Sequence, residues 1–405
     1  MGGALKKPSL TAWIFIAMAA GVAVGAAFPG IAKTKEMAAL AQVFLRLIKS
    51  ILAPLLFGTL VAGMAGHGSL KTMGRIGLKA LVYFEVVTTF ALFIGLAAVN
   101  LTRPGDGIKL QRTAAEAQVA HAGASLETLL EHTFPASVVD AMAKGEVLQI
   151  VVFSLLFGAA CAAIGAKSKP VVEFCASLAE VMFRYTKYIM YAAPVGVLAA
   201  MAYAIGSNGT GVLFSLGKLV LTLYGALVVF VVFVLGAVAT IARIPIGGFL
   251  RAVREPWMIA FSTAASEAAL PIALENMEEF GVPKHIVAFV LPAGYSLNLD
   301  GSTLYLSLAA VFVAQAAGVA LTFGQQLVML LTLMLTSKGV AGVPRASLVI
   351  LAGTLATFQL PVEGVAVLLG VDVLMDMVRT SVNVLGNCLA SAVVARWEGV
   401  RFSRA

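Results

Sequence analysis

Long apolar stretches constrain this chain more than any other feature of its sequence. An α-helix needs about twenty mostly apolar residues to cross a bilayer, and several stretches reach that length. They cover residues 11–30, 39–65, 76–100, 147–166, 171–206 and 212–243. They lack the ten-residue alternation of membrane β-barrels. Only 12% of the 405 residues are charged and the mean hydropathy is +0.97, so the sequence predicts an all-α integral membrane protein.

Lysine and arginine gather at alternate ends of these stretches, which predicts how the chain is oriented. The basic groups lie at residues 6–7, 71–79, 167–169, 243–254 and 396–404. By the positive-inside bias, both termini are expected in the cytoplasm, and the chain is expected to be multi-pass in the cell inner (plasma) membrane. The polar segment 101–146 reads as an outer loop. The net charge of +8 therefore indicates membrane anchoring rather than nucleic-acid binding.

The sequence contains no motif that is typical of a catalytic site or a cofactor-binding site, and it identifies no metal site with certainty. Cys161, Cys175 and Cys388 lie in apolar sequence without metal-ligand spacing, and the four histidines form no local motif. An intramembrane hydrolase that uses Ser302 and a histidine is disfavoured, because no Gly-x-Ser-x-Gly elbow is present. We therefore expect no enzymatic activity and no cofactor.

A polar stripe occupies residues 370–387. Its members are four, three, four and four residues apart, which places them on one face of a helix. They are Asp372, Asp376, Arg379, Asn383 and Asn387. Ionisable groups at membrane depth normally face a bundle interior or a water-filled cavity and serve function. The alternative is a structural ion pair of Arg379 with Asp376 or Asp372.

After residue 245 the helical segments become short, and small polar residues interrupt them. The interruptions lie at 262–271, 295–301 and 336–344. The first and third correspond, because each combines a small-residue tip with a following proline and precedes a longer helix carrying Asp and Asn. Interrupted segments in corresponding positions indicate a transporter binding site built from inverted repeats.

Four motifs in these segments follow one another in a characteristic order. They are Ser266-Glu-Ala-Ala-Leu-Pro271, Asn298-Leu-Asp-Gly-Ser302, Gly339-Val-Ala-Gly-Val-Pro344, and Asp376 with Arg379, Thr380 and Asn383. They resemble the first hairpin tip, the Asn-x-Asp-Gly-Thr break in the seventh helix, the second hairpin tip and the binding helix of one family. That family is the dicarboxylate/amino acid:cation symporters, in particular its glutamate/aspartate transporters. The resemblance extends over essentially the whole chain.

The resemblance implies an architecture of about eight transmembrane helices plus two re-entrant helical hairpins, with inverted repeats, a homotrimeric assembly and an elevator mechanism. Scaffold helices 1 and 2 would occupy residues 1–74. Helices 4 and 5, with the outer loop, would occupy 101–206. The transport domain would combine helix 3, at 75–100, with helix 6, the two hairpins and helices 7 and 8, at 207–405. The second hairpin would form the extracellular gate.

The resemblance also implies glutamate or aspartate as the substrate, and the chemistry of the matching residues agrees. Arg379 offers a planar fork for the side-chain carboxylate, and Ser302 could add a hydroxyl group. Asp376 would bind the ammonium group, assisted by Thr380.

The remaining binding residues would surround the α-carboxylate and close the site. Asn383 and the backbone around Ser266 would bind the α-carboxylate, because helix N-termini favour anions. Gly342 and Val343 belong to the second hairpin tip and complete the expected site.

Carriers of other substrates on the same fold remain alternatives. C4-dicarboxylates have no ammonium group, and the resemblance suggests that their carriers lack the acid seen here as Asp376. Carriers of neutral amino acids lack the guanidinium seen here as Arg379. An uncoupled anion channel is less well supported, because a pair of opposite charges suits a zwitterionic substrate.

The coupling ion is where this chain departs from its sodium-driven relatives. Those relatives have an Asp where Asn387 stands, and a Tyr–Thr pair where Phe84 and Val87 stand. The residual framework for a cation comprises Asn298, Asp300, Thr88 and Asn387. Neutral Asn387 contributes one carbonyl oxygen and no charge, whereas a hard cation needs several oxygen ligands.

A proton needs only one titratable group, so the sequence favours proton coupling, with sodium as the alternative. Glu85 and Glu267 are carboxylates in surroundings of low polarity, where desolvation favours protonation. Leu306 stands where animal relatives have their proton-carrying glutamate. The alternative is that both residues have only structural roles: Glu85 faces the bundle or the cytoplasm, and Glu267 caps a hairpin helix.

Overall fold

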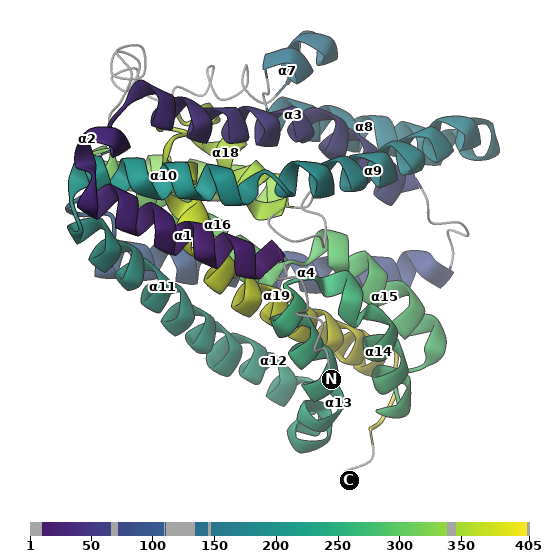
Figure 1. The fold of residues 1–405 in the computed structure, drawn as a ribbon. Coiled ribbons are helices and arrows are strands. Elements are labelled where there is room, and N and C mark those ends of the chain that lie inside the picture. Colours follow the sequence, from purple (N-terminus) through teal and green to yellow (C-terminus); the bar gives the residue numbers. More distant parts are fainter. Residues whose placement is uncertain are drawn as a thin grey trace, which may run out of the picture.

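The computed structural model describes residues 10–65, 72–108, 110, 134–144, 147–337 and 346–402. Within these ranges all regular secondary structure is helical, as predicted (Figure 1). Some of the helical stretches in this part are long and apolar enough to cross a membrane. They are Arg75–Thr102, Val152–Met182, Gly211–Ile241 and Lys284–Ala316.

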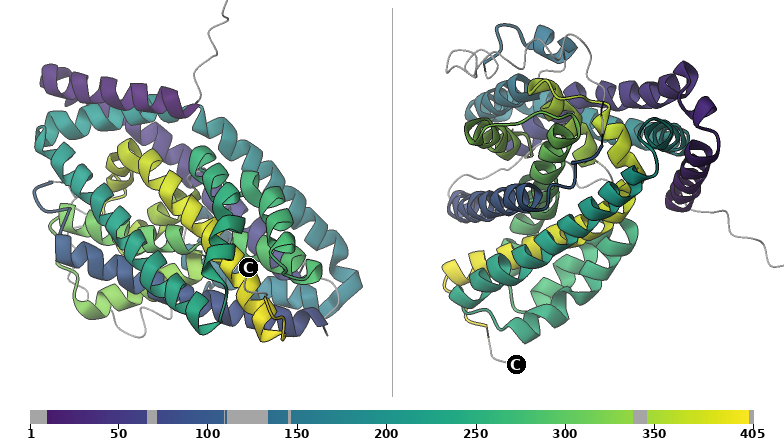
Figure 2. Two further views of the ribbon diagram at one scale, coloured as in Figure 1. Left: turned by 90° about the horizontal axis from the view of Figure 1, so that it is seen from below. Right: turned by 90° about the vertical axis from the view of Figure 1, so that its left-hand side faces the viewer.

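One set of helices packs around α3. The set comprises α1 (Leu10–Ala27), α2 (Pro29–Ala32), α3 (Lys35–Ala65), α7 (Val138–Lys144), α8 (Val147–Ile164), a 3₁₀ turn (Gly165–Ser168), α9 (Lys169–Met190) and α10 (Ala193–Asn208). α3 contacts α8, α9 and α10, while α1 lies along α10 at one edge of the molecule (Figures 1 and 2). The α1–α10 contact is close because Gly21 has no side chain: a Cβ atom there would lie 2.6 Å from the Leu198 carbonyl oxygen.

The apolar stretch predicted at 171–206 is two helices, not one. α9 ends at Met190, and the amide groups of Tyr191 and Ala192 donate to carbonyls only three residues earlier. Pro194 then lies in the first turn of α10, where its missing N–H leaves no helical hydrogen bond unmade. Hydropathy is continuous through this turn, so an apolar run alone cannot reveal it.

The second set packs around the C-terminal helix and α16. It comprises α4 (Thr72–Thr102), α11 (Gly211–Val229), a π-helical turn (Phe230–Leu235), α12 (Gly236–Ile241), α13 (Ile246–Thr263), α14 (Ser266–Glu279), α15 (Lys284–Leu297), α16 (Asp300–Ala316), α17 (Phe323–Thr336), α18 (Ala346–Thr357) and α19 (Gly364–Trp397). α19 packs against α4, α10, α11, α13, α14, α15 and α16. Figure 2 shows α19 in yellow beside α11. Its polar face is therefore enclosed by protein on nearly all sides.

Two of the predicted interruptions are visible as breaks between helices. α13 ends where Ala264 takes a left-handed conformation (φ 50°), and Ala265 is extended before α14 begins. α15 and α16 are separated by Asn298 and Leu299, which are not helical. Most of the third interruption, including the predicted binding residues Gly342 and Val343, lies outside the described residues.

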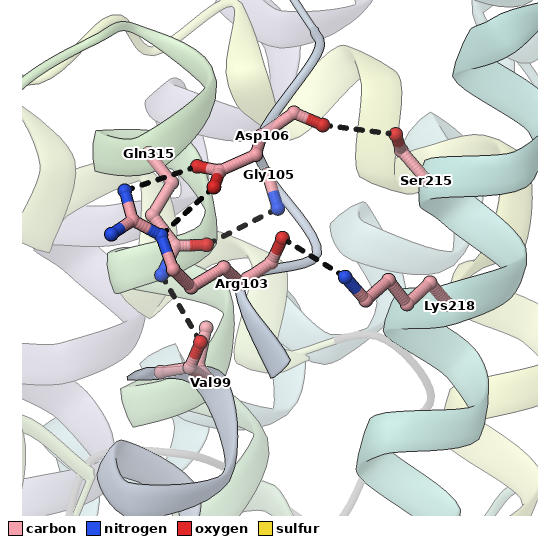
Figure 3. Close-up of polar contacts among 7 residues, drawn as sticks. All are labelled: Val99, Arg103, Gly105, Asp106, Ser215, Lys218 and Gln315. Atoms are coloured by element: carbon pink, nitrogen blue, oxygen red, sulfur yellow. Dashed lines mark hydrogen bonds and ion pairs between the residues drawn. The ribbon is translucent and has the colours of Figure 1, made fainter. Parts of the chain in front are cut away.

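The turn after α4 is fastened to α16 by one side chain (Figure 3). The Gln315 amide donates from Nε2 to the Val99 carbonyl oxygen at 3.1 Å and accepts from the Gly105 N–H at 3.1 Å. Two longer contacts come from α11, from Lys218 Nζ to the Arg103 carbonyl oxygen and from Ser215 Oγ to the Asp106 carbonyl oxygen, both at 3.5 Å. This turn therefore joins the ends of α4, α11 and α16.

Gly105→Ala should destabilise this junction by about 1–3 kcal/mol, the usual cost of forcing an extra carbon into a packed interior. A Cβ atom at residue 105 would lie 2.5 Å from the Phe312 carbonyl oxygen and 2.6 Å from Gln315 Cβ. Thermal unfolding of the purified protein in detergent measures the effect. Gly217→Ala is the matched control, because a Cβ atom there meets nothing within 4 Å. Equal melting temperatures for the two variants would contradict the expected clash.

Candidate functional site

The centre of the site is a charged triad on α19. Arg379 and Asp372 are fully buried, and Asp376 is 5% exposed. The guanidinium bonds both acids, from Nη1 to Asp372 Oδ1 at 2.9 Å and from Nε to Asp376 Oδ1 at 2.9 Å. Nη2 lies 2.8 Å from the same Asp376 oxygen. Both ion pairs considered from the sequence are thus present, because residues three and seven positions apart share one helix face.

An aromatic ring from another helix packs against the face of the guanidinium group. The Arg379 Cζ atom lies 4.2 Å from the centre of the Tyr305 ring, a cation–π contact. Tyr305 belongs to α16 and is fully buried. It was not among the residues expected from the sequence. Its position near the start of the helix that follows Asn298-Leu-Asp-Gly is the only sequence feature that could have pointed to it.

Asn383, four residues after Arg379 on α19, connects this helix to the first turn of α16. Its Oδ1 atom accepts hydrogen bonds from the Gly301 N–H at 2.8 Å and the Ser302 N–H at 3.2 Å, and its Nδ2 atom donates to Ser302 Oγ at 3.0 Å. α16 can approach this closely because Gly301 has no side chain: a Cβ atom there would lie 2.3 Å from the Arg379 carbonyl oxygen. On the other side, Thr380 Oγ1 donates to Asp376 Oδ1 at 3.4 Å.

A second buried cluster lies where α15 and α16 meet α19. Asn298 Nδ2 donates to Asp300 Oδ2 at 3.0 Å and to Asn387 Oδ1 at 3.1 Å, and all three side chains are fully buried. Glycines make the room, since a Cβ atom at Gly294 would lie 2.2 Å from Asn387 Oδ1, and one at Gly386 would lie 2.4 Å from Asp300 Oδ2. Among the described residues, Asn298 Oδ1 and Asn387 Nδ2 have no hydrogen-bond partner.

The second cluster offers oxygen atoms, which hard cations prefer as ligands. Thr88, the fourth residue of the expected cation framework, is buried on α4. On the same helix, the Tyr83 hydroxyl donates to the Gly386 carbonyl oxygen at 3.5 Å. No group of three or more His, Cys, Asp and Glu side chains that could hold a metal ion occurs in the described part of the chain.

The other expected residues lie apart from these clusters or outside the description. Ser266 is buried at the start of α14 and, within the described residues, makes no side-chain hydrogen bond to either cluster. Glu85 is half-buried on α4. Glu267 lies in the first turn of α14, but its side chain is outside the described part. The structure thus brings together Asp376, Arg379, Thr380, Asn383 and Ser302, and separately Asn298, Asp300 and Asn387.

Long apolar helices that enclose ionisable side chains beside breaks in the backbone define the class of this protein as a multi-pass helical membrane transporter. The chain belongs to the sodium:dicarboxylate symporter family, whose model matches residues 10–397. It is a transporter and not an enzyme.

Curated relatives cover nearly the whole chain. The proton/sodium-glutamate symport protein of Geobacillus stearothermophilus is 42% identical over 403 residues, 98% of this chain and 96% of that protein. The C4-dicarboxylate transport protein of Solibacter usitatus is 44% identical over 400 residues, 97% and 93%. The proton/glutamate-aspartate symporter of Escherichia coli is 42% identical over 368 residues, 88% and 84%. Relatives with different substrates are therefore about equally similar to this chain.

Proposed function

We propose that this protein is a proton-coupled symporter that imports the acidic amino acids glutamate and aspartate. The observation that carries the proposal is the contact between Arg379 and Asp376 in a buried site, with Nη2 and Oδ1 2.8 Å apart. An acidic amino acid carries two carboxylates and one ammonium group. A fixed cation beside a fixed anion complements its side-chain carboxylate and its ammonium at neighbouring points.

The proposed binding step exchanges one ion pair for two. The substrate's side-chain carboxylate takes the edge of the Arg379 guanidinium that Asp376 now occupies, and Asp376 then receives the ammonium group. Asp372 and Tyr305 keep the guanidinium in place from the other sides. Arg379 and Asp376 each keep an opposite charge during the exchange, which matters because an unpaired buried charge is costly.

The remaining site residues take supporting roles in this proposal. Ser302 contributes its hydroxyl to the side-chain carboxylate, and Thr380 supports Asp376 at the ammonium. Asn383 and the backbone near Ser266 bind the α-carboxylate. Asn383 also fixes the first turn of α16 through its bonds to two backbone N–H groups.

A C4-dicarboxylate is the second candidate substrate, since relatives named as C4-dicarboxylate transport proteins are 44% and 41% identical to this chain. Overall identity does not separate the two substrates, so the argument rests on Asp376. A dicarboxylate would bring a second anion to this acid, and the two like charges would repel each other at low dielectric. Asp376 therefore favours a substrate with an ammonium group.

The proposed mechanism is an elevator in a homotrimer, with about eight membrane helices and two hairpins. In this proposal helices from 1–74 and 101–206 form the scaffold, and 75–100 with 207–405 form the moving part. Two features support it. α19 packs mostly against helices of the second set, and the two buried clusters lie within α16, α19 and the break between α15 and α16. The substrate site could therefore move as one unit.

Proton coupling is proposed because the second cluster is poor in charge. Asp300 is its only ionisable member, and Asn387 contributes a neutral amide. We assign proton transfer to Glu85 or Glu267, while sodium held by Asn298, Asp300, Thr88 and Asn387 is the alternative. The relatives named as proton/sodium-glutamate and proton/glutamate-aspartate symporters are consistent with either ion.

Uptake of labelled aspartate, glutamate and succinate into proteoliposomes tests the proposal. Proton and sodium gradients are imposed separately. We expect saturable accumulation of the two amino acids, driven by an inward proton gradient in the absence of sodium. Strict dependence on a sodium gradient with no response to pH would refute proton coupling, and preferential accumulation of succinate would refute the substrate.

Glu85→Gln or Glu267→Gln should abolish accumulation driven by a proton gradient, because an amide cannot carry a proton across. Exchange of internal for external aspartate should continue, since the proposed substrate site uses neither of the two side chains. Paired uptake and exchange measurements separate the two effects. Glu36→Gln is the matched control, because Glu36 is exposed in the first turn of α3. Full proton-driven accumulation in both test variants would exclude both assignments.

A further inference from the structure

An apolar groove lies between α4, α12 and α19, and none of the residues that form the two buried clusters lines it. Its volume is about 500 Å³. Side chains from two helices form much of its wall, namely Val82 and Val86 of α4 and Val238 and Ile241 of α12. Val82 and Val86 are each 49% exposed, and Ile241 is 82% exposed. In a membrane protein such a surface faces lipid rather than water.

Two arginines border this groove at the end where α12 and α19 finish. Arg243 follows α12 in a left-handed conformation (φ 54°) and is exposed. Arg396, in the last turn of α19, is half-buried and donates from Nε to the Ala242 carbonyl oxygen at 3.0 Å and from Nη1 to the Val400 carbonyl oxygen at 2.9 Å. Within the described residues neither arginine forms a salt bridge. Two guanidinium groups thus meet one apolar groove.

The nearby acid is already neutralised by other cations. Glu398 forms ion pairs with Arg75 and, at 2.6 Å, with Lys79. Hydrogen bonds from Lys79 and then Arg75 lower the pKa of Glu398, so its carboxylate stays charged and stays paired with them. Arg243 and Arg396 therefore contribute positive charge that no carboxylate in the described part of this region balances.

Trp397 indicates where this end of the groove lies relative to the membrane surface. Its side chain lines the groove and the residue is 46% exposed, and tryptophan prefers the level of lipid headgroups at the membrane–water interface. We therefore expect the two arginines to lie at the level of the lipid headgroups, and the apolar side chains of the groove to lie at the level of the acyl chains.

A second apolar groove, between α4 and α11, provides a comparison within the same molecule. It is larger, about 860 Å³, but Lys218 is the one basic residue among its lining residues. The Lys218 ammonium already contacts the Arg103 carbonyl oxygen (Figure 3). The pairing of an apolar groove with two arginines thus distinguishes the groove at α12 and α19.

We propose that the groove between α4, α12 and α19 is a binding site for an anionic phospholipid. The headgroup phosphate would lie between Arg243 and Arg396, where guanidinium groups can bind its oxygens in bidentate fashion. One acyl chain would lie along Val82, Val86 and Ile241. Basic pockets between membrane helices bind anionic lipid headgroups in other proteins. The proposed lipid site does not depend on which substrate the protein transports.

Native mass spectrometry of the full-length protein, released from detergent with added phosphatidylglycerol or phosphatidylcholine, tests this site. Phosphatidylglycerol should bind more tightly than phosphatidylcholine. Arg243→Gln should weaken phosphatidylglycerol binding about fivefold, the effect of one basic side chain near anionic lipid. Phosphatidylcholine binding should not change. Arg243 is the primary variant because its side chain makes no hydrogen bond within the described residues, so the fold does not depend on it.

Arg251→Gln is the matched control, because it removes the same charge from an exposed position on α13 outside the groove. It should leave phosphatidylglycerol binding unchanged. Glycerol phosphate, which has the headgroup chemistry without acyl chains, should not displace the lipid. Equal phosphatidylglycerol binding by wild type and Arg243→Gln, an equal loss in Arg251→Gln, or displacement by glycerol phosphate would each overturn the proposal.

Discussion

Arg379→Lys should weaken aspartate binding about 10- to 150-fold, because hydrogen bonds to charged groups contribute roughly 1.5–3 kcal/mol each. The guanidinium now bonds Asp372 and Asp376 along two separate edges while Tyr305 covers its face. Lysine keeps the charge but presents a compact ammonium that cannot reproduce the planar fork. The fold should tolerate this change, since both acids keep a cation nearby. Isothermal calorimetry with aspartate on the purified protein measures the loss.

Arg379→Ala should abolish acidic amino acid binding altogether, but it also removes the cation shared by Asp372 and Asp376. Removing one member of a buried ion pair costs about 3–5 kcal/mol of stability, so this variant must be compared with a second variant that remains folded. The double variant Arg379→Ala with Asp372→Asn removes one of the two acids and should melt closer to wild type. Loss of binding in a folded double variant assigns the effect to recognition.

Arg103→Lys provides the matched control for the lysine variant. Arg103 is 65% exposed by its side chain and pairs with Asp106 at the surface, so the same chemical change there should not alter aspartate binding. Unchanged aspartate affinity in Arg379→Lys and in the double variant would leave only the structural interpretation of the triad, in which α19 uses these ion pairs for packing.

Asp376→Ser should weaken aspartate binding far more than succinate binding. Aspartate would lose its ammonium partner, and a buried group left without a hydrogen-bond partner costs roughly 1–3 kcal/mol, more when it is charged. Succinate has no ammonium group, so the change removes a repulsive charge from its site. We expect the ratio of the two affinities to shift toward succinate by about tenfold or more, corresponding to roughly 1.4 kcal/mol.

Competition against labelled aspartate, with both ligands titrated on the same preparation, gives this ratio directly. Asp376→Asn is a second test variant of the same shape, which separates the loss of charge from the loss of volume. Asp140→Asn is the surface control, because the Asp140 side chain is 57% exposed and forms a surface ion pair with Lys144 on α7. An equal loss of affinity for both ligands would show that Asp376 does not bind the ammonium group.

The local part of the site could be predicted from the sequence because helix geometry is periodic. Residues spaced three and four apart share a face of α19, so the spacing of the polar residues alone reveals the stripe. The breaks that precede α14 and α16 can be recognised in the same way, since small polar residues mark both of them. Continuous hydropathy gives no sign of the turn between α9 and α10, where the first helix ends and Tyr191 and Ala192 lead into the second.

Contacts between distant segments could not be predicted in the same way. Tyr305 lies 74 positions before Arg379 in the chain, yet its ring covers the guanidinium. Asn298 and Asn387 are 89 residues apart and share a hydrogen bond. No periodicity connects such pairs, because their meeting depends on how α15, α16 and α19 cross.

The sequence by itself thus determined that this is a helical membrane protein, which residues form its buried polar face, and which family it resembles. These properties follow from composition, spacing and motif order, all of which can be read along the chain. Only the tertiary structure decided which partner each side chain meets, such as Tyr305 beside Arg379 and Asn298 beside Asn387. The physical reason is close packing: α16 and α15 reach α19 only where Gly301, Gly294 and Gly386 leave space, and that fit depends on three helices at once.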